Sequence, residues 1–417
     1  MALPQRLLPS YEYCDYDAAR QPTPSCDCRN VDQAQAKKSR KARRTGPRVA
    51  ALLALLVLVL SACSGTGPQT ALNPEGPIGR TIDDLWELVF IIATIVFFIV
   101  ETAIVYVIIR YRARKGDDRE PVQVHGNTKL EILWTIIPVV ILASISYPIV
   151  TGIFDVRAIA EGPDVLQVQV TGHQWWWEFE YVDLADETGR TLITANELVI
   201  PEDTRVNLTM TSADVIHSFW VPILAGKRDV VPNRISNLTL IADNPTDPDA
   251  PHPGQCAEYC GLAHADMRLK VHVRSQADFD SWVDAQLTPA EIPTAGAEAA
   301  GYESFNVTCI ACHNSTVAGA DGAEDIGPVR HIEVDGVTFV SSLAPNLTHF
   351  GDRITFGSGT FDNTTEHLAE WLADPSSIKP MRPELNDIPE GRILGMPDFN
   401  LSTDEINNLI ALLQGWE

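Results

Sequence analysis

Long apolar runs fall only in the first third of the chain, and they predict its membrane segments. The run at residues 49–63 (VAALLALLVLVLSAC) is shorter than the roughly 20 residues that a helix needs to cross a bilayer. Two later runs, 85–112 and 132–154, are long enough. We therefore expect a transmembrane helix hairpin over residues 85–154.

The short run has the pattern of a secretory signal. It follows the basic stretch KKSRKARR and ends in the small residues LSAC. LSAC also resembles a bacterial lipoprotein processing box, with Cys63 as the lipidated residue. Residues 1–62 are then a leader and 63–84 an extracytoplasmic segment. The alternative is a signal anchor that is not cleaved.

The loop between the two long runs sets the predicted topology. Its sequence, RYRARKGDDR, is basic, and basic loops favour the cytoplasmic side. Everything after Phe154 then lies outside the cytoplasmic membrane of a bacterial cell. Glu101 falls within the first span, where a carboxyl group is costly, so it indicates either a partner membrane subunit or a protonated structural residue. Glu131 stands at the cytoplasmic end of the second span, where an ordinary helix-start carboxylate also would.

From Val165 onward the pattern changes to alternating apolar and polar residues. VLQVQVTG, RVNLTMTS and further short runs are typical of β-strands and predict a sandwich or barrel over residues 160–275. Residues 276–300 are rich in Ala, Pro and Gly and predict a linker with room for a helical piece. In residues 301–417, TEHLAEWLADP and the capping sequence STDE predict amphipathic helices and a small all-α domain.

The formal net charge of −24 makes nucleic acid an unfavourable partner. The acidity either serves solubility alone or attracts a basic redox partner. Neither interpretation bears on the fold.

A dense group of soft side chains lies in GQCAEYCGLAHADM, residues 254–267, and one more lies upstream in DVIHSFWVP. The candidate ligands are Cys256, Cys260, His264, Met267 and His217. Soft ligands select copper, zinc or iron–sulfur. Zinc sites close with four Cys or His ligands and need no thioether, and a single blue-copper site uses one thiolate.

The second thiolate favours two copper ions bridged by both sulfurs. Each ion would take one imidazole and one weak ligand, and a backbone carbonyl at Glu258 is placed to be the second weak ligand. A Cys256–Cys260 disulfide and a zinc site remain the alternatives.

CIACHN supplies the Cys-x-x-Cys-His pattern of covalent c-type haem attachment. Cys309 and Cys312 would form the two thioether links, and His313 would be the proximal iron ligand. The sixth ligand is expected to be a methionine or histidine from downstream, and a Met/His pair raises the potential, which suits electron transfer. Met396, in LGMPDFN, is preferred to Met381.

Four motifs resemble subunit II of the haem–copper cytochrome c oxidases: GHQWWWEFEY, DVIHSFWVP, GKRDVVPNR and GQCAEYCGLAHADM. LEILWTIIP in the second span is similar to the same family, and WLADPSSIKP resembles the cytochrome domains fused to it. The resemblance implies a multidomain membrane protein. It would have a two-helix transmembrane hairpin, an all-β cupredoxin domain with the binuclear copper centre CuA, and a small all-α cytochrome c domain.

The resemblance also implies roles for single residues. The copper ligands would be His217, Cys256, the Glu258 carbonyl, Cys260, His264 and Met267. The Glu258 carboxylate would bind a magnesium or manganese ion shared with subunit I. Trp175 would be the residue through which electrons enter from cytochrome c, and Glu131 would lie at the mouth of a proton path.

The function that the resemblance implies is electron delivery to a proton-pumping oxidase. Electrons would pass from a cytochrome c or a cytochrome bc complex to haem c, to CuA, and to haem a of subunit I, which reduces oxygen. Subunit I, subunit III and membrane lipid would be its neighbours. Two alternatives are the corresponding subunit of a CuA-containing nitric oxide reductase and, more remotely, a copper-delivery protein.

Overall fold

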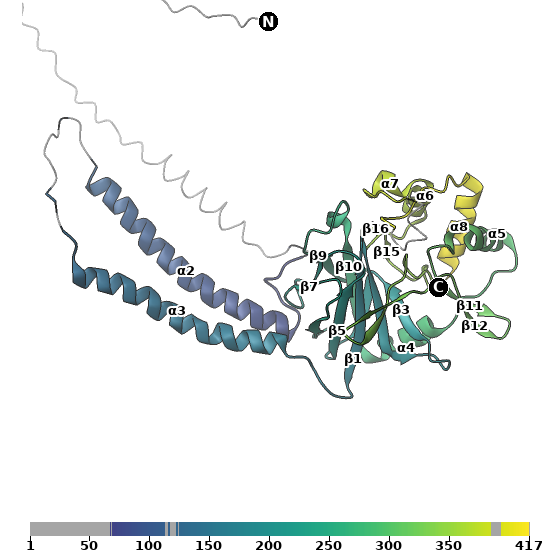
Figure 1. Ribbon diagram of the computed structural model, residues 1–417, viewed down its shortest axis with the longest axis horizontal. Coiled ribbons are helices and arrows are strands. Elements are labelled where there is room, and N and C mark those ends of the chain that lie inside the picture. The colour runs from purple at the N-terminus through teal and green to yellow at the C-terminus, as the bar shows by residue number, and fades with distance from the viewer. Residues whose placement is uncertain are drawn as a thin grey trace, which may run out of the picture. The chain divides into compact units, whose positions relative to one another are not determined.

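The computed structural model describes residues 67, 69–112, 116, 122–123, 125–384 and 393–416. The predicted leader and Cys63 lie outside this part of the chain. Within it, a pair of long helices is followed by a β-rich domain and then by a helical domain (Figure 1).

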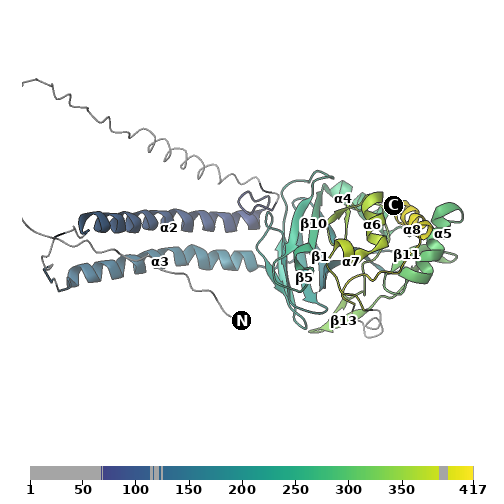
Figure 2. The same cartoon turned by 90° about the horizontal axis from the view of Figure 1, so that it is seen from above.

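The two long helices are α2 (Pro77–Arg110) and α3 (Thr128–Arg157), and both are long and apolar enough to cross a membrane. They lie side by side in both views (Figures 1 and 2). A Cβ on Gly152 of α3 would come within 2.6 Å of Leu85 Cδ1 of α2, so the glycine lets the helices approach closely. The predicted hairpin is confirmed, and both helices begin earlier than the apolar runs because more polar first turns precede them.

The β-rich domain contains two five-stranded sheets, with the orders β3-β2-β1-β5-β8 and β4-β10-β9-β6-β7. The strands of the first sheet are β1 (Val165–His173), β2 (Trp176–Ala185), β3 (Thr191–Ala195), β5 (Arg205–Ser212) and β8 (Ser236–Leu240). Those of the second sheet are β4 (Glu197–Pro201), β6 (His217–Trp220), β7 (Arg228–Val230), β9 (His252–Cys256) and β10 (Arg268–Arg274).

The alternation in the sequence arises because each sheet buries one face. In β1, Val168 and Val170 are buried whereas Gln169 between them is only half buried. In the core between the sheets, the Phe219 ring lies edge-on to those of Trp177 and Phe179. The predicted all-β domain is confirmed.

The expected linker begins with a helix that belongs to the β domain. Ser275 caps α4 (Gln276–Leu287) by accepting a hydrogen bond from the Asp278 N–H. Phe279 and Val283 of this helix join the hydrophobic core of the β domain. The connection to the next domain is therefore short, at residues 288–295.

The described residues of the C-terminal domain contain four α-helices and a π-helical turn at Phe305–Cys309. The α-helices are α5 (Gly296–Ser304), α6 (Thr365–Ala373), α7 (Pro375–Ile378) and α8 (Thr403–Gly415). α8 begins at the predicted capping box, in which Ser402 and Glu405 each bond the other's backbone N–H group. α5 and α8 pack closely because Gly301 lies directly against the Asn408 carbonyl (Figure 2).

Three short hairpins accompany these helices, so the domain is not purely helical. They pair β11 (Ser315–Gly319) with β12 (Gly322–Ile326), β13 (His331–Val334) with β14 (Val337–Val340), and β15 (Thr355–Phe356) with β16 (Phe361–Asp362). A signal for the second hairpin was present in the sequence. Asp335 and Gly336 both adopt positive φ, at 52° and 81°, as a two-residue hairpin turn requires.

Candidate functional site

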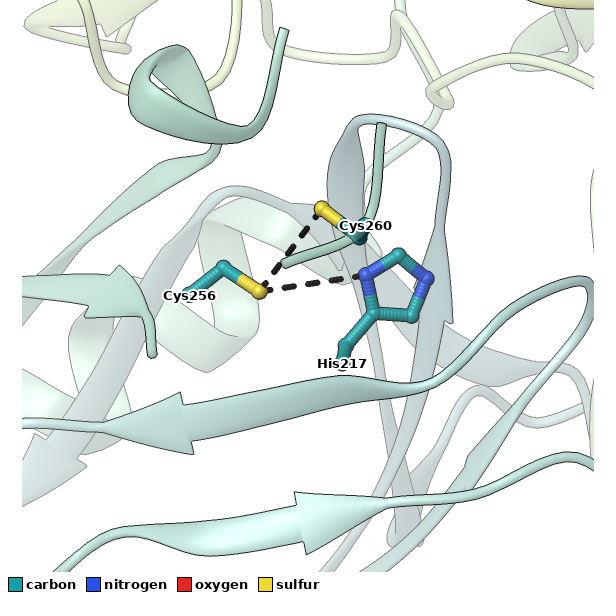
Figure 3. A group of neighbouring side chains, drawn as sticks. All are labelled: His217, Cys256 and Cys260. Carbon is teal, nitrogen blue, oxygen red and sulfur yellow. Dashed lines mark hydrogen bonds between the residues drawn. The ribbon is translucent and has the colours of Figure 1, made fainter. Parts of the chain in front are cut away.

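The second sheet and its loops bring the five predicted side-chain ligands together. His217 begins β6 and Cys256 ends β9, and these two strands are neighbours in the sheet. The loop after β9 carries Cys260 and His264, and Met267 immediately precedes β10. In Figure 3, the two cysteine sulfurs and the His217 ring point toward one another.

Each cysteine sulfur lies near a different histidine ring. Cys256 Sγ lies 3.9 Å from His217 Nδ1, and Cys260 Sγ lies 3.5 Å from His264 Nδ1. Cys260 Sγ is also 3.7 Å from the Met267 sulfur. The two cysteine sulfurs are 3.8 Å apart and both thiols are free, so they do not form the disulfide kept as an alternative.

The Glu258 carbonyl completes the group of donors, because it lies 3.2 Å from Cys256 Sγ. The hydrogen bond between the two thiols lowers the pKa of Cys256 and raises that of Cys260. Cations between the sulfurs would stabilise both thiolates at once. Two thiolates, two imidazoles, a thioether and a carbonyl exceed the four ligands of a zinc site and fit a pair of copper ions.

Asp214 is a further candidate residue of this site that the sequence analysis did not identify. Its Oδ1 lies 2.9 Å from His217 Nε2. Burial opposes a charged imidazole, but the hydrogen bond to Asp214 raises the pKa of His217. Because the carboxylate holds the proton on Nε2, Nδ1 is free to face the sulfurs. The signal was a carboxylate three residues before a candidate histidine ligand.

Asp214→Asn is expected to lower the affinity for copper by about 10–100-fold, because the histidine loses the carboxylate that orients it. Copper retained by the purified protein against a graded chelator measures this. Asp183→Asn, on the exposed side of β2, is the matched control and should retain copper like the parent protein. Equal copper retention in both variants would show that Asp214 does not orient the ligand.

Trp175 lies directly against the cysteine loop. Its indole is only 4% exposed, and its Nε1–H donates to the Cys260 carbonyl at 3.0 Å. Gly261 follows at φ +116°, and a Cβ there would lie 3.2 Å from the indole. The glycine thus allows the indole to pack on the chain beside Cys260.

A second site is a cavity that the C-terminal domain forms with the β domain. Its lining includes Cys309, Cys312, His313, Met381, Met396 and Trp175, together with apolar side chains such as Leu368 and Phe350. All the predicted haem-binding residues therefore face one space. That space extends to the indole that contacts Cys260.

The turn that carries the Cys-x-x-Cys-His motif and the loop that contains Pro345 hold His313 in the protonation state that a metal ligand needs. The turn is closed by the His313 N–H, which donates to the Cys309 carbonyl at 2.9 Å. His313 Nδ1 lies 2.8 Å from the Pro345 carbonyl, which can only accept, so Nδ1 carries the proton. Burial lowers the pKa of His313 to about 4, and the neutral ring keeps Nε2 unprotonated. This is the tautomer that an axial iron ligand needs.

Both candidate methionines line the cavity. Trp371 Nε1–H donates to Met396 Sδ at 3.1 Å, which fixes the direction of that thioether. Met381 is buried against Gly395, where a Cβ would come within 2.4 Å of its sulfur. The Trp371 contact supports Met396 as the sixth ligand, which stays a prediction.

Three predicted carboxylates are exposed in the isolated chain. Glu131 lies in the first turn of α3, which Asn127 caps, and Glu101 lies within α2. Glu258 is exposed on the loop between the two cysteines. All three are open to a partner, and the helix-start position expected of Glu131 is confirmed.

Comparison with known proteins identifies the family. Residues 166–274 match the family described as cytochrome c oxidase subunit II, periplasmic domain, and residues 70–151 match its transmembrane domain. The chain is 33% identical to cytochrome c oxidase subunit 2 of Alkalihalophilus pseudofirmus over 368 residues, which cover 87% of this chain and 95% of the relative. It is 32% identical to cytochrome c oxidase subunit 2 of Bacillus subtilis over 379 residues, covering 88% and 97%.

The similarity extends to cytochrome c oxidase subunit 2 of Bacillus sp. strain PS3, 35% identical over 280 residues that cover 65% of this chain and 72% of the relative. These relatives are subunits of an oxidoreductase. The helix hairpin, the β domain and these matches agree along the chain, which belongs to the cytochrome c oxidase subunit II family.

Proposed function

We propose that this chain is the subunit through which electrons enter a proton-pumping haem–copper terminal oxidase. It accepts them from a cytochrome c or a cytochrome bc complex and delivers them to haem a of subunit I, where oxygen is reduced to water. Covalent haem c and binuclear CuA supply the chemistry when bound, because each takes up and releases one electron at a time. The chain itself binds and orients these groups.

One observation carries this proposal. The Trp175 indole lines the cavity of the haem-attachment motif and donates its N–H to the carbonyl of Cys260. A single buried side chain therefore connects the two candidate redox sites. A copper-delivery protein would not need this connection.

The chain's own residues hold the two groups in a dry environment. The proposed copper ligands are His217, Cys256, the Glu258 carbonyl, Cys260, His264 and Met267, and the proposed haem ligands are Cys309, Cys312, His313 and Met396. Asp214 and the Pro345 carbonyl each fix one imidazole tautomer. Both cysteine sulfurs of the copper site belong to buried residues, which excludes water.

The surfaces left exposed support a membrane complex with subunit I and subunit III. Tyr259 and Leu262 are 75% and 49% exposed on the copper loop, where an apolar surface favours a protein neighbour. We assign the Glu258 carboxylate on the same loop to a magnesium or manganese ion shared with subunit I. Glu131 is assigned to the mouth of a proton path. The apolar sides of α2 and α3 face lipid and these subunits in the bacterial cytoplasmic membrane, with both redox domains outside.

The assembly purified through this chain tests the proposal. The denatured polypeptide should stain for covalent haem, and the native complex should show the spin-resonance signal of a mixed-valence copper pair. Reduced cytochrome c should support oxygen uptake. Zinc in place of copper, or reduction of nitric oxide in place of oxygen, would contradict the proposal.

The electron donor is expected to be basic, because residues 301–417 contain 18 Asp and Glu against five Lys and Arg. Raising the ionic strength from about 20 to about 200 mM should raise the KM for a basic cytochrome c by roughly tenfold, since salt screens the attraction. The kcat should change much less. A KM that does not change with salt would show that the acidic surface serves solubility alone.

A further inference from the structure

A buried lysine of the C-terminal domain donates a hydrogen bond to the main-chain carbonyl of Trp175. Lys379 Nζ donates to the Trp175 carbonyl at 3.2 Å, to the Gly357 carbonyl at 3.2 Å and to Ser358 Oγ at 2.7 Å. Ser358 Oγ itself donates to the same Trp175 carbonyl. Two side chains of one domain therefore converge on one backbone oxygen of the other.

The lysine is an unusual residue to bury at this position. It is 3% exposed, and within the described part of the chain its ammonium group contacts carbonyl and hydroxyl oxygens and forms no ion pair with a carboxylate. Burial accordingly lowers the pKa of Lys379 to about 7. An amino group kept buried with three hydrogen-bond partners is the mark of a specific contact.

The turn that contains Ser358, beside Lys379 and Trp175, has a strained backbone conformation. Gly357, Ser358 and Gly359 have φ values of 58°, 68° and 66°, a left-handed conformation that a serine seldom adopts. Ser358 is 4% exposed, and its carbonyl accepts the Arg268 N–H of β10 at 3.1 Å. A strained backbone that is kept in a buried turn indicates that the geometry of this turn serves a function.

Further polar contacts fix the same interface. The Thr355 N–H donates to Glu197 Oε1 at 2.8 Å, and the Ser342 N–H donates to Glu178 Oε2 at 3.0 Å. Both carboxylates belong to the β domain and are buried. The C-terminal domain is therefore held on the β domain at several points, and the contact at Trp175 borders both the cavity of the haem-attachment motif and the cysteine loop.

We propose that Lys379 and Ser358 are positioning residues that lock the C-terminal domain onto the backbone of Trp175. This lock holds the indole against the haem cavity while its N–H stays on the Cys260 carbonyl. The consequence for electron transfer rests on the function proposed above. The lock itself does not, because it can be measured at the backbone of the intact chain.

The test compares Lys379→Met and Ser358→Ala with the parent protein in the intact complex. The first readout is hydrogen exchange of the Arg268 amide, which bridges the domains through the Ser358 carbonyl. The second is the rate of electron transfer from haem c to the copper pair after photoreduction of the haem. We expect faster exchange, and transfer slowed by about tenfold to a hundredfold in Lys379→Met, because a small displacement of a positioned group is costly.

Lys270→Met is the matched control, because this lysine lies half-buried on β10 within the β domain and contributes no side chain to the cavity. Haem content and the copper spin-resonance signal should be unchanged in all variants, which separates loss of the lock from loss of either redox group. Methionine replaces the buried amine with an apolar group of similar length, so the domain should still fold.

The other outcomes each overturn the proposal. Unchanged exchange and unchanged transfer would show that Lys379 is an incidental buried residue. Slower transfer with unchanged exchange would assign the effect to the charge and not to a lock. Faster exchange with unchanged transfer would show that the lock does not position the indole.

Discussion

Cys256→Ser is expected to remove the binuclear copper signal and to reduce oxygen uptake from reduced cytochrome c to background. The serine hydroxyl is a hard, neutral donor that cannot replace a bridging thiolate, and the proposed copper site depends on soft ligands. The change also removes the sulfur that lies 3.9 Å from His217 Nδ1 and 3.2 Å from the Glu258 carbonyl. Copper per chain and the spin-resonance spectrum measure the result.

Covalent haem provides the control for this variant. Cys256 lies in the β domain, away from the attachment motif, so the denatured Cys256→Ser chain should stain for haem as strongly as the parent protein. A Cys256→Ser protein that kept two copper ions and their mixed-valence signal would disprove a bridging role for this sulfur.

The double variant Cys309→Ser with Cys312→Ser is expected to abolish haem staining of the denatured chain. It should also slow reduction of the copper pair by a soluble donor by about a hundredfold or more, because a tethered carrier acts at high effective concentration. His313 and Met396 would then hold the iron of an unattached haem without a covalent link, and denaturation would release it. Staining after denaturation and the kinetics of copper reduction measure the two effects.

The copper signal is the control for the double variant, since the ligands from His217 to Met267 are untouched. The two cysteine changes thus form a reciprocal pair, each removing one group and leaving the other. Rapid reduction of copper in the variant without haem would mean that electrons do not need the C-terminal domain.

Much of the candidate copper site could be predicted from the sequence because its proposed ligands lie close together in the chain. Cys256, Cys260, His264 and Met267 lie between the end of β9 and the start of β10, so their spacing alone limits which metals can fit. The haem-attachment motif is shorter still. The β domain was equally predictable, because a sheet with one buried face imposes an alternation such as that of β1.

The contacts between distant segments could not be predicted. Asp214 can orient His217 only because the loop before β6 brings its carboxylate back to the ring. This folding leaves no periodic pattern in the sequence. The contact of Trp175 with the Cys260 carbonyl joins residues 85 positions apart. The hairpins of the C-terminal domain were missed because their strands are very short, although Asp335 and Gly336 marked one turn.

The covered position of Trp175 has a consequence for the choice of redox partner. Trp175 is only 4% exposed, and Lys379 and Ser358 donate hydrogen bonds to its carbonyl. A diffusing redox protein therefore cannot contact the indole directly. Under the proposed function, the choice of electron donor is then made at the outer face of the C-terminal domain. Replacing the chain from residue 296 onward with a different electron-carrier domain should change which donor proteins are accepted. The proposed pair of copper ions should stay the same.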